Sequence, residues 1–209
     1  LGAESPFGQG VRHGHGPVSG GVTVTEASGP TVTELDDRPA YDVWHELVSD
    51  IAGEDLDIDL EALATDDEEF VKLLTQFEFG IETSGGQYKI RWPGLTDSTD
   101  GPLHFATAIP EGTELFLMDS NQEAQLSAQL AACDNAAEST EGDYAGAIAF
   151  NCICQANILG EQFGDGVSDM AAQLDAPLAG MEVYGEVGLD DDDMRGYHNA
   201  TSAVLLLPE

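Results

Sequence analysis

The chain has 209 residues, enough for one large domain or two small ones, and carries 40 acidic residues against 6 lysines and arginines, a net charge of −34. So few cations cannot neutralise the phosphates of a nucleic acid or favour an anionic membrane surface, which excludes both as partners. The 42% of hydrophobic residues is enough to build a core and excludes a disordered chain.

The acidic residues are spread along the whole chain and do not gather in one partner-binding segment. Mutual repulsion destabilises a compact protein of this charge in ordinary buffer. Concentrated salt removes that cost, because the Debye length falls to about 3 Å at 1 M ionic strength. We therefore expect a salt-adapted, acidic protein from a halophilic microbe.

The three cysteines, Cys133, Cys152 and Cys154, show no zinc-binding spacing. A strand through the apolar run around Cys152 would place the thiols of Cys152 and Cys154 on one face. A disulfide between residues two apart would be strained, so reduced thiols in an intracellular protein are expected. No apolar run approaches the roughly 18 residues of a membrane helix.

The first part of the chain predicts a hairpin followed by a helix. Residues 1–20 are rich in Gly and His without a hydrophobic period, which indicates a loop or frayed end. The β-branched segments 22–25 and 31–35 flank Ser28-Gly29-Pro30 and predict a β-hairpin. Pro39 suits the first turn of a helix with an apolar stripe made of Trp44, Leu47, Val48 and Ile51.

The middle of the chain predicts two further helices with strands between them. Thr65-Asp66-Asp67-Glu68 is a capping-box pattern that should open a helix. Strands are expected over residues 87–92, 103–109 and 114–118. A second capping box, Ser120-Asn121-Gln122-Glu123, should open an alanine-rich helix that ends near residue 136.

The most apolar run, 147–154, has the length of a strand buried on both faces and should be central. Strands are also expected over 178–187 and 202–207. Between them a helix should carry one apolar side, formed by Leu159, Phe163, Val167, Met170 and Leu174. The irregular alternation of helices and strands predicts an α+β fold, with a mixed, largely antiparallel β-sheet core flanked by helices, such as an α-β-β-α sandwich.

Candidate metal sites are weak. Asp55, Asp57 and Asp59 alternate as in a calcium loop, but Leu60 and Asp66 replace the required glycine and bidentate glutamate. The acidic run 190–193 is more typical of a solvated loop, and His13 and His15 supply only two ligands. The glycine-rich signatures of phosphate and dinucleotide sites are absent, so no metal and no cofactor is predicted.

Four stretches, taken in order, carry a family resemblance. They are Val24-Thr25 through Arg38-Pro39-Ala40-Tyr41, then Gly146–Cys152, Pro177–Gly188 and Tyr197-His198-Asn199-Ala200-Thr201. This order resembles the C-terminal half of FIST proteins, a sensory family with a Phe-x-Cys strand end, a Gly-Glu turn and a closing His-Asn-x-Thr. One departure is Ile153-Cys154-Gln155-Ala156, which stands where many relatives have a Gly-Arg-Gly type loop. An anionic ligand of such relatives is therefore not expected here.

The resemblance implies a domain division and a function. Residues 1–36 would be the tail of a preceding FIST N-terminal domain, a loop plus a β-hairpin, and residues 37–209 a FIST C-like ligand-sensing domain. That domain would be a cytoplasmic, non-enzymatic module that binds a small ligand, such as an amino acid or related metabolite, in signal transduction. The implied partners are this ligand, the FIST N-terminal domain and a signalling output partner.

The matched motifs also imply ligand-binding residues. These are Phe150, Cys152, Tyr184, Gly185, Glu186, His198, Asn199 and Thr201. Glu186 would meet a ligand ammonium, and Asn199 and Thr201 would supply neutral hydrogen bonds. Structural roles are the alternatives, with Cys152 as a small core residue, the glycine serving backbone geometry, and His198 and Asn199 capping a turn.

Two other functions stay open at this point. A protein-interaction scaffold without a ligand should expose an apolar patch and lack an internal pocket. A thiol enzyme would use Cys152 as nucleophile and His198 as base, which requires the two groups within about 3 to 4 Å of each other.

The charge balance generates a first prediction. On dilution from about 3 M to about 0.1 M salt, the unscreened acidic surface should cost the chain its folded structure. Circular dichroism and a thermal melt across this salt series measure the effect. A melting temperature that does not change with salt would contradict the assignment of the acidic residues to salt adaptation.

Overall fold

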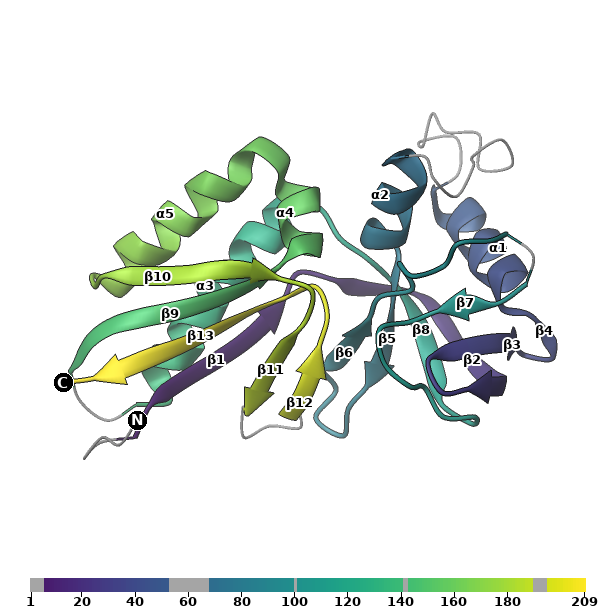
Figure 1. The fold of residues 1–209 in the computed structure, drawn as a ribbon, viewed down its shortest axis with the longest axis horizontal. Coiled ribbons are helices and arrows are strands. Elements are labelled where there is room, and N and C mark those ends of the chain that lie inside the picture. Colours follow the sequence, from purple (N-terminus) through teal and green to yellow (C-terminus); the bar gives the residue numbers. More distant parts are fainter. Residues whose placement is uncertain (1–5, 53–67, 100, 141–142, 190–194) are drawn as a thin grey trace. The chain divides into compact units, whose positions relative to one another are not determined.

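A computed structural model of the chain describes residues 6–52, 68–99, 101–140, 143–189 and 195–209 (Figure 1). The chain divides into two compact units. The first contains the residues up to His15 together with Thr83–Gln87 and Ser120–Glu209, and the second contains Gly16–Glu82 and Tyr88–Asp119. Both units combine helices with sheets in which antiparallel pairing predominates, which confirms the predicted α+β class.

The division predicted after residue 36 concerns the domains of the family and stays a prediction. Neither compact unit begins at that residue, because the chain enters the second unit at Gly16.

The first unit is built on a four-stranded sheet in the order β1-β13-β9-β10. The strands are β1 (Gly8–His13), β13 (Thr201–Pro208), β9 (Tyr144–Cys152) and β10 (Leu178–Val183). Strand β13 runs antiparallel to β1 and β9, whereas β10 runs parallel to β9. The parallel pair needs a crossover, which the helices between β9 and β10 supply. Strand β9 is therefore interior to the sheet, as its apolar sequence predicts.

Helices cover one face of this sheet (Figure 1). They are α3 (Gln122–Glu138), α4 (Ile153–Leu159), the 3-10 turn η2 (Gly160–Gln162) and α5 (Phe163–Leu174). Ala147 and Ala149 of β9 pack with Met170 and Leu174 of α5 in one apolar cluster. The odd-numbered residues of β9 therefore face the helices, and the even-numbered residues face the opposite side.

A two-stranded ribbon lies against the opposite face of the same sheet (Figure 1). It consists of β11 (Glu186–Leu189) and β12 (Arg195–His198), paired antiparallel so that Glu186 is opposite His198. A side chain at Gly188 would overlap Val11 of β1, so this glycine allows the ribbon to approach the sheet closely.

The second unit contains an antiparallel sheet in the order β4-β3-β2-β8-β5-β6, with β7 paired to β3. Its strands are β2 (Gly16–Ser28), β3 (Thr31–Leu35), β4 (Arg38–Pro39), β5 (Glu78–Glu82), β6 (Tyr88–Arg91), β7 (Leu103–His104) and β8 (Glu114–Asp119). Helices α1 (Ala40–Ala52) and α2 (Glu68–Gln76) belong to the same unit. The fully buried Trp44 of α1 donates from Nε1 to the carbonyl oxygen of Phe77 at 3.0 Å.

Most predicted elements are confirmed. The hairpin around Ser28-Gly29-Pro30 is β2–β3, and the helix after Pro39 is α1. The two strands expected over residues 87–92 and 114–118 are β6 and β8. The capping residues 65–67 and the candidate cation segments 55–66 and 190–193 lie outside the described residues.

Five local predictions are wrong. Residues 8–13 and 16–20 form strand instead of a loop. Residues 105–109 do not continue β7, because the N–H groups of Phe105 and Ile109 donate to carbonyls of the β2–β3 turn. Asn121, and not Ser120, caps α3, since its side chain accepts from the Ala124 N–H at 2.9 Å. The helix after β9 divides at Gly160, and the strand expected over 178–187 divides at Tyr184-Gly185.

The cysteine prediction also needs correction. All three cysteines are free thiols, as expected. Cys152 ends β9, however, and Cys154 lies in α4, so the two do not share one strand face.

Glycines of β1 allow the close packing of this strand against α3. A Cβ atom at Gly8 or Gly10 would overlap the carbonyl oxygens of Ala136 and Ala132 in the helix. This requirement explains why the segment carries no strand-like side-chain pattern, since glycine is otherwise unfavourable in a strand.

The packing of β1 generates a second prediction. Gly10→Ala should destabilise the protein by about 1 to 3 kcal/mol, because backbone atoms of α3 cannot move aside cheaply. Gly164→Ala is the matched control: nothing lies within 4 Å of the new methyl group on α5, so up to about 1 kcal/mol of stabilisation is expected. Denaturant unfolding in high salt measures both, and equal effects of the two substitutions would contradict the packing argument.

Candidate functional site

The carboxyl group of Glu186 is the centre of a buried polar cluster beneath the sheet. The side chain is 2% exposed, and the hydroxyl group of Thr201 donates a hydrogen bond to Oε2. Burial raises the pKa of Glu186 to about 9, since little water remains to solvate the charged form, and negative charge on the neighbouring Cys152 acts in the same direction. The carboxyl group is therefore protonated at neutral pH.

Cys152 is the second titratable group of this cluster and is 1% exposed at the end of β9. Hydrogen bonds from the Cys154 thiol and from the N–H groups of Cys154 and Ala200 lower the pKa of the Cys152 thiol to about 7, against the opposing effect of burial. Ala200 has a left-handed backbone, with φ of 52°, at the turn that brings its N–H to this sulfur. Hydrogen bonding from Glu186 stabilises the same thiolate.

The β11–β12 ribbon and its ends hold the cluster together. His198 is fully buried and lies opposite Glu186 in the strand register. Asn199 donates from Nδ2 to the Tyr197 hydroxyl at 3.1 Å, and that hydroxyl donates to the carbonyl oxygen of Tyr184 at 3.1 Å.

Gly185 shapes the corner before β11. Its φ is +151°, and a side chain there would overlap the ring of Tyr197. Both observations favour glycine at this corner.

The structure brings together most of the residues that the family motifs imply. Cys152, Glu186 and Thr201 interact directly, His198 and Asn199 are buried beside them, and Gly185 forms the adjoining corner. Phe150 lies two residues before Cys152 on the same strand face and is partly buried. Tyr184 differs from the rest, because its side chain is 75% exposed and only its carbonyl oxygen joins the network.

The hydrogen-bonding groups predicted for a ligand are already used within the protein. Thr201 donates to Glu186, and Asn199 donates to Tyr197. Contact between a ligand and this cluster therefore requires movement of the β11–β12 ribbon.

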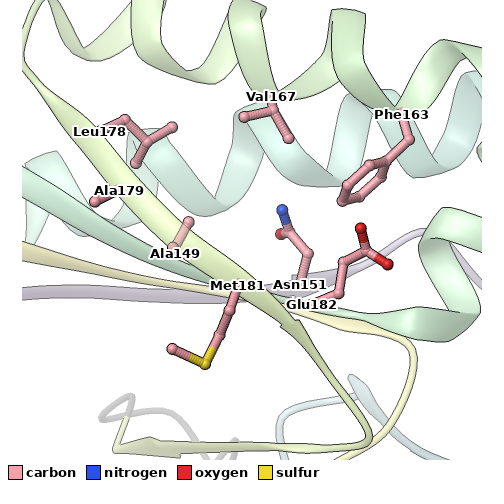
Figure 2. Close-up of a pocket in the computed structure, with 9 residues that line it drawn as sticks. Ala149, Asn151, Phe163, Val167, Leu178, Ala179, Met181 and Glu182 are labelled. Carbon is pink, nitrogen blue, oxygen red and sulfur yellow. The ribbon is translucent and has the colours of Figure 1, made fainter.

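A pocket lies on the other, helix-covered face of the same strand end (Figure 2). Its volume is about 210 Å³, and it is lined by Ala149, Asn151, Phe163, Val167, Leu178, Ala179, Gly180, Met181 and Glu182. Sequence reasoning missed this pocket, since it is formed between β9, β10 and α5. One signal was available: Asn151 is a polar residue inside the most apolar run, next to Cys152 and thus on the opposite face.

The fold and the cluster define an α+β domain with a buried thiol and carboxyl pair at a strand end. The family model described as the FIST C domain matches residues 40–189, so the chain belongs to this family of sensory domains in signal transduction. No curated protein and no solved structure matches the chain. Among the described residues, no helix is both long enough and apolar enough to cross a bilayer.

The buried pair generates a third prediction. From about pH 4.5 to about 7, the unfolded chain releases a proton that folded Glu186 keeps, so this group makes stability fall as pH rises. From about pH 7 to 9, the lowered pKa of Cys152 acts in the opposite direction, because folded Cys152 releases its proton first. Glu186→Gln should therefore become more stable relative to the wild type as pH rises from about 5 to about 7.

Denaturant unfolding over this pH range measures the difference. Glu161→Gln, which removes an acidic group from an exposed position, is the control for a general charge effect. Parallel curves for the wild type and Glu186→Gln would show that the buried carboxyl group does not hold its proton.

Proposed function

We propose that this chain acts as a non-enzymatic small-ligand-binding sensory domain in the cytoplasm, with an amino acid or related metabolite as ligand and a separate signalling partner as output. The single observation that carries this proposal is the pocket of about 210 Å³ on the helix-covered face of β9 at its end. The residues that the family motifs imply do not line this pocket, because they lie on the opposite face of the sheet or beyond the strand end. Ligand sites are typically concave, mostly apolar and supplied with a few convergent polar groups.

The thiol and carboxyl cluster adds support. Strongly perturbed titratable groups gather at functional sites, and Glu186 and Cys152 are two such groups in contact. The proposed ligand-binding residues of the sequence motifs, apart from the exposed Tyr184 side chain, lie at or beside this pair. Once the ribbon moves, Oε1 of the uncharged Glu186 would accept a hydrogen bond from a ligand ammonium.

Two observations favour binding over thiol catalysis. Cys152 is 1% exposed, whereas a reactive thiol needs access to its substrate. Its sulfur is also held within the protein by hydrogen bonds from Cys154 and Glu186, so it is not presented to a substrate.

A second candidate, a protein-interaction scaffold, is favoured by one surface. Met181, Tyr184 and Val187 are exposed by 61%, 75% and 73%. They lie in and after the edge strand β10, where residues 176–185 contain a single acidic residue although the chain has 40. An edge strand with little charge can accept a further strand from a partner.

A thermal-shift screen of amino acids and related metabolites in about 3 M salt tests the proposed function. A specific ligand should raise the melting temperature progressively, with about 2.7 kcal/mol of stabilisation at a hundredfold excess over its Kd. In parallel, sedimentation of the wild type and of Met181→Asp tests the scaffold by measuring whether the chain associates through the exposed surface around β10. An absence of any concentration-dependent shift, together with an association lost in Met181→Asp, would replace the sensor by the scaffold.

A further inference from the structure

The pocket is bounded by a row of polar side chains that crosses the helix-covered face of the sheet. In the strand register Arg12 pairs with Ser202, Ser202 with Asn151, and Asn151 with Glu182. Directly paired residues share one face of a sheet, so these four side chains form a continuous row. The row ends at Glu182 on the edge strand, where the pocket lies.

The residues of the next row along the strands are apolar and small, and this leaves the space of the pocket. Gly10, Val204, Ala149 and Gly180 are paired in the same manner. Ala149 and its strand partner Gly180 line the pocket on the sheet side. Phe163 and Val167 of α5 form its roof above Ala149 (Figure 2). The pocket is therefore apolar over most of its length and polar at one end.

Ser202 is the hydrogen-bond partner of the Asn151 side-chain oxygen on the helix-covered face. The Ser202 hydroxyl oxygen lies 2.7 Å from Asn151 Oδ1 and 2.8 Å from Gln155 Oε1, but a hydroxyl group has one hydrogen to donate. Gln155 is fully buried, and its Nε2 has no hydrogen-bond partner among the described residues. Of the two oxygens, Asn151 Oδ1 is the nearer acceptor of the Ser202 hydroxyl hydrogen.

This arrangement leaves the NH₂ group of Asn151 for the pocket. The Asn151 side chain is 5% exposed, and no hydrogen bond of its Nδ2 is found among the described residues. Figure 2 shows the nitrogen directed from β9 towards α5, between Val167 and Phe163, with the carboxylate of Glu182 next to it. A bound molecule would thus meet a hydrogen-bond donor and a negative charge side by side.

We propose that the pocket between β9, β10 and α5 binds a small aliphatic amine that carries a hydrogen-bond acceptor beside its ammonium group. The acceptor takes the hydrogen bond from Asn151, the ammonium group pairs with Glu182, and a short branched carbon chain fills the space between Ala149, Val167 and Leu178. This inference rests on the proposed function and deepens it, since it gives the sensor a site and a ligand class apart from the Glu186 cluster.

The energetic balance favours the apolar part of such a ligand. The exposed Glu182 contributes a modest, screened attraction, roughly a two- to fivefold gain in affinity. The buried amide of Asn151 fixes the orientation of the ligand. Concentrated salts that are excluded from the protein surface strengthen the burial of the apolar carbon chain. A simple carboxylic acid of the same shape is disfavoured, because its charge would lie against Glu182.

Three probes of matching shape test the class on the full chain in high salt. Valinol has both polar groups, isoamylamine lacks the acceptor, and isovalerate lacks the amine. Thermal shift and calorimetry should rank valinol first and isoamylamine next, with isovalerate weakest. Glu182→Gln should reduce the preference for valinol over isovalerate. Isovalerate binding as tightly as valinol would overturn the ligand class.

Substitution in the roof tests the location. Val167→Trp fills the pocket from α5 without altering the sheet and should weaken valinol binding at least tenfold. Ser168→Trp places the same side chain at the exposed neighbouring position and should leave binding unchanged. Circular dichroism checks that both variants are folded, and Asn151→Ala supplies an independent change with an expected loss of roughly three- to tenfold.

The outcomes separate this inference from the proposed function. Valinol binding that survives Val167→Trp but is lost in Glu186→Ala would overturn the pocket and leave a sensor with its site at the cluster. If none of the three probes binds while the wider metabolite screen yields a ligand, the amine class is wrong and the sensor remains. If neither yields a ligand, both fail.

Discussion

The constraint on which this site depends is the burial of β9 on both faces at its C-terminal end. The strand is paired on both sides, with β13 and β10, so its side chains can only point towards the helices or towards the β11–β12 ribbon. Polar side chains in such surroundings need partners, because an unsatisfied buried group costs about 1 to 3 kcal/mol. Asn151 and Cys152 meet this need on opposite faces, the first through Ser202 and the second through Cys154 and Glu186.

The last residues of β9 and the first residues of β13 therefore place side chains on both faces of the sheet. Asn151 and Cys152 are consecutive on β9, and Thr201 and Ser202 are consecutive on β13. Ser202 holds Asn151 on the helix side, and Thr201 holds Glu186 on the ribbon side. Under the further inference, a ligand that engages Asn151 in the pocket acts on the backbone that also positions Cys152. The cluster can then respond to an occupied pocket with no contact to the ligand.

The parts of this arrangement that were predictable are those encoded by local patterns. The apolar run around Cys152 predicts the central strand, and the spacing of Trp44, Val48 and Ile51 predicts α1. The family motifs pointed correctly to one region for Cys152, Glu186 and Thr201, although no short-range pattern links residues so far apart in the sequence. Their role in binding stays a prediction.

The parts that were not predictable depend on packing between distant segments. Strand β1 has a glycine-rich sequence because α3 approaches its backbone, and a helix that begins only at Gln122 cannot be inferred from Gly8 and Gly10. The pocket likewise needs the parallel pairing of β9 with β10 and the position of α5 above them. Asn151 alone carried a signal, since an amide inside an apolar strand implies a specific polar partner.

Glu186 differs in kind from the other acidic residues of the chain. Exposed carboxylates in a chain with a net charge of −34 repel one another, and salt relieves that repulsion. Glu186 is 2% exposed and protonated, so it adds no charge to the surface, and mobile ions cannot approach it closely. The proton affinity of the cluster is therefore set by Thr201, Cys152 and burial, whereas the predicted dependence on salt concerns the exposed acidic residues. If that prediction holds, a change in salt concentration should act on the stability of the fold and not on the proton affinity of the cluster.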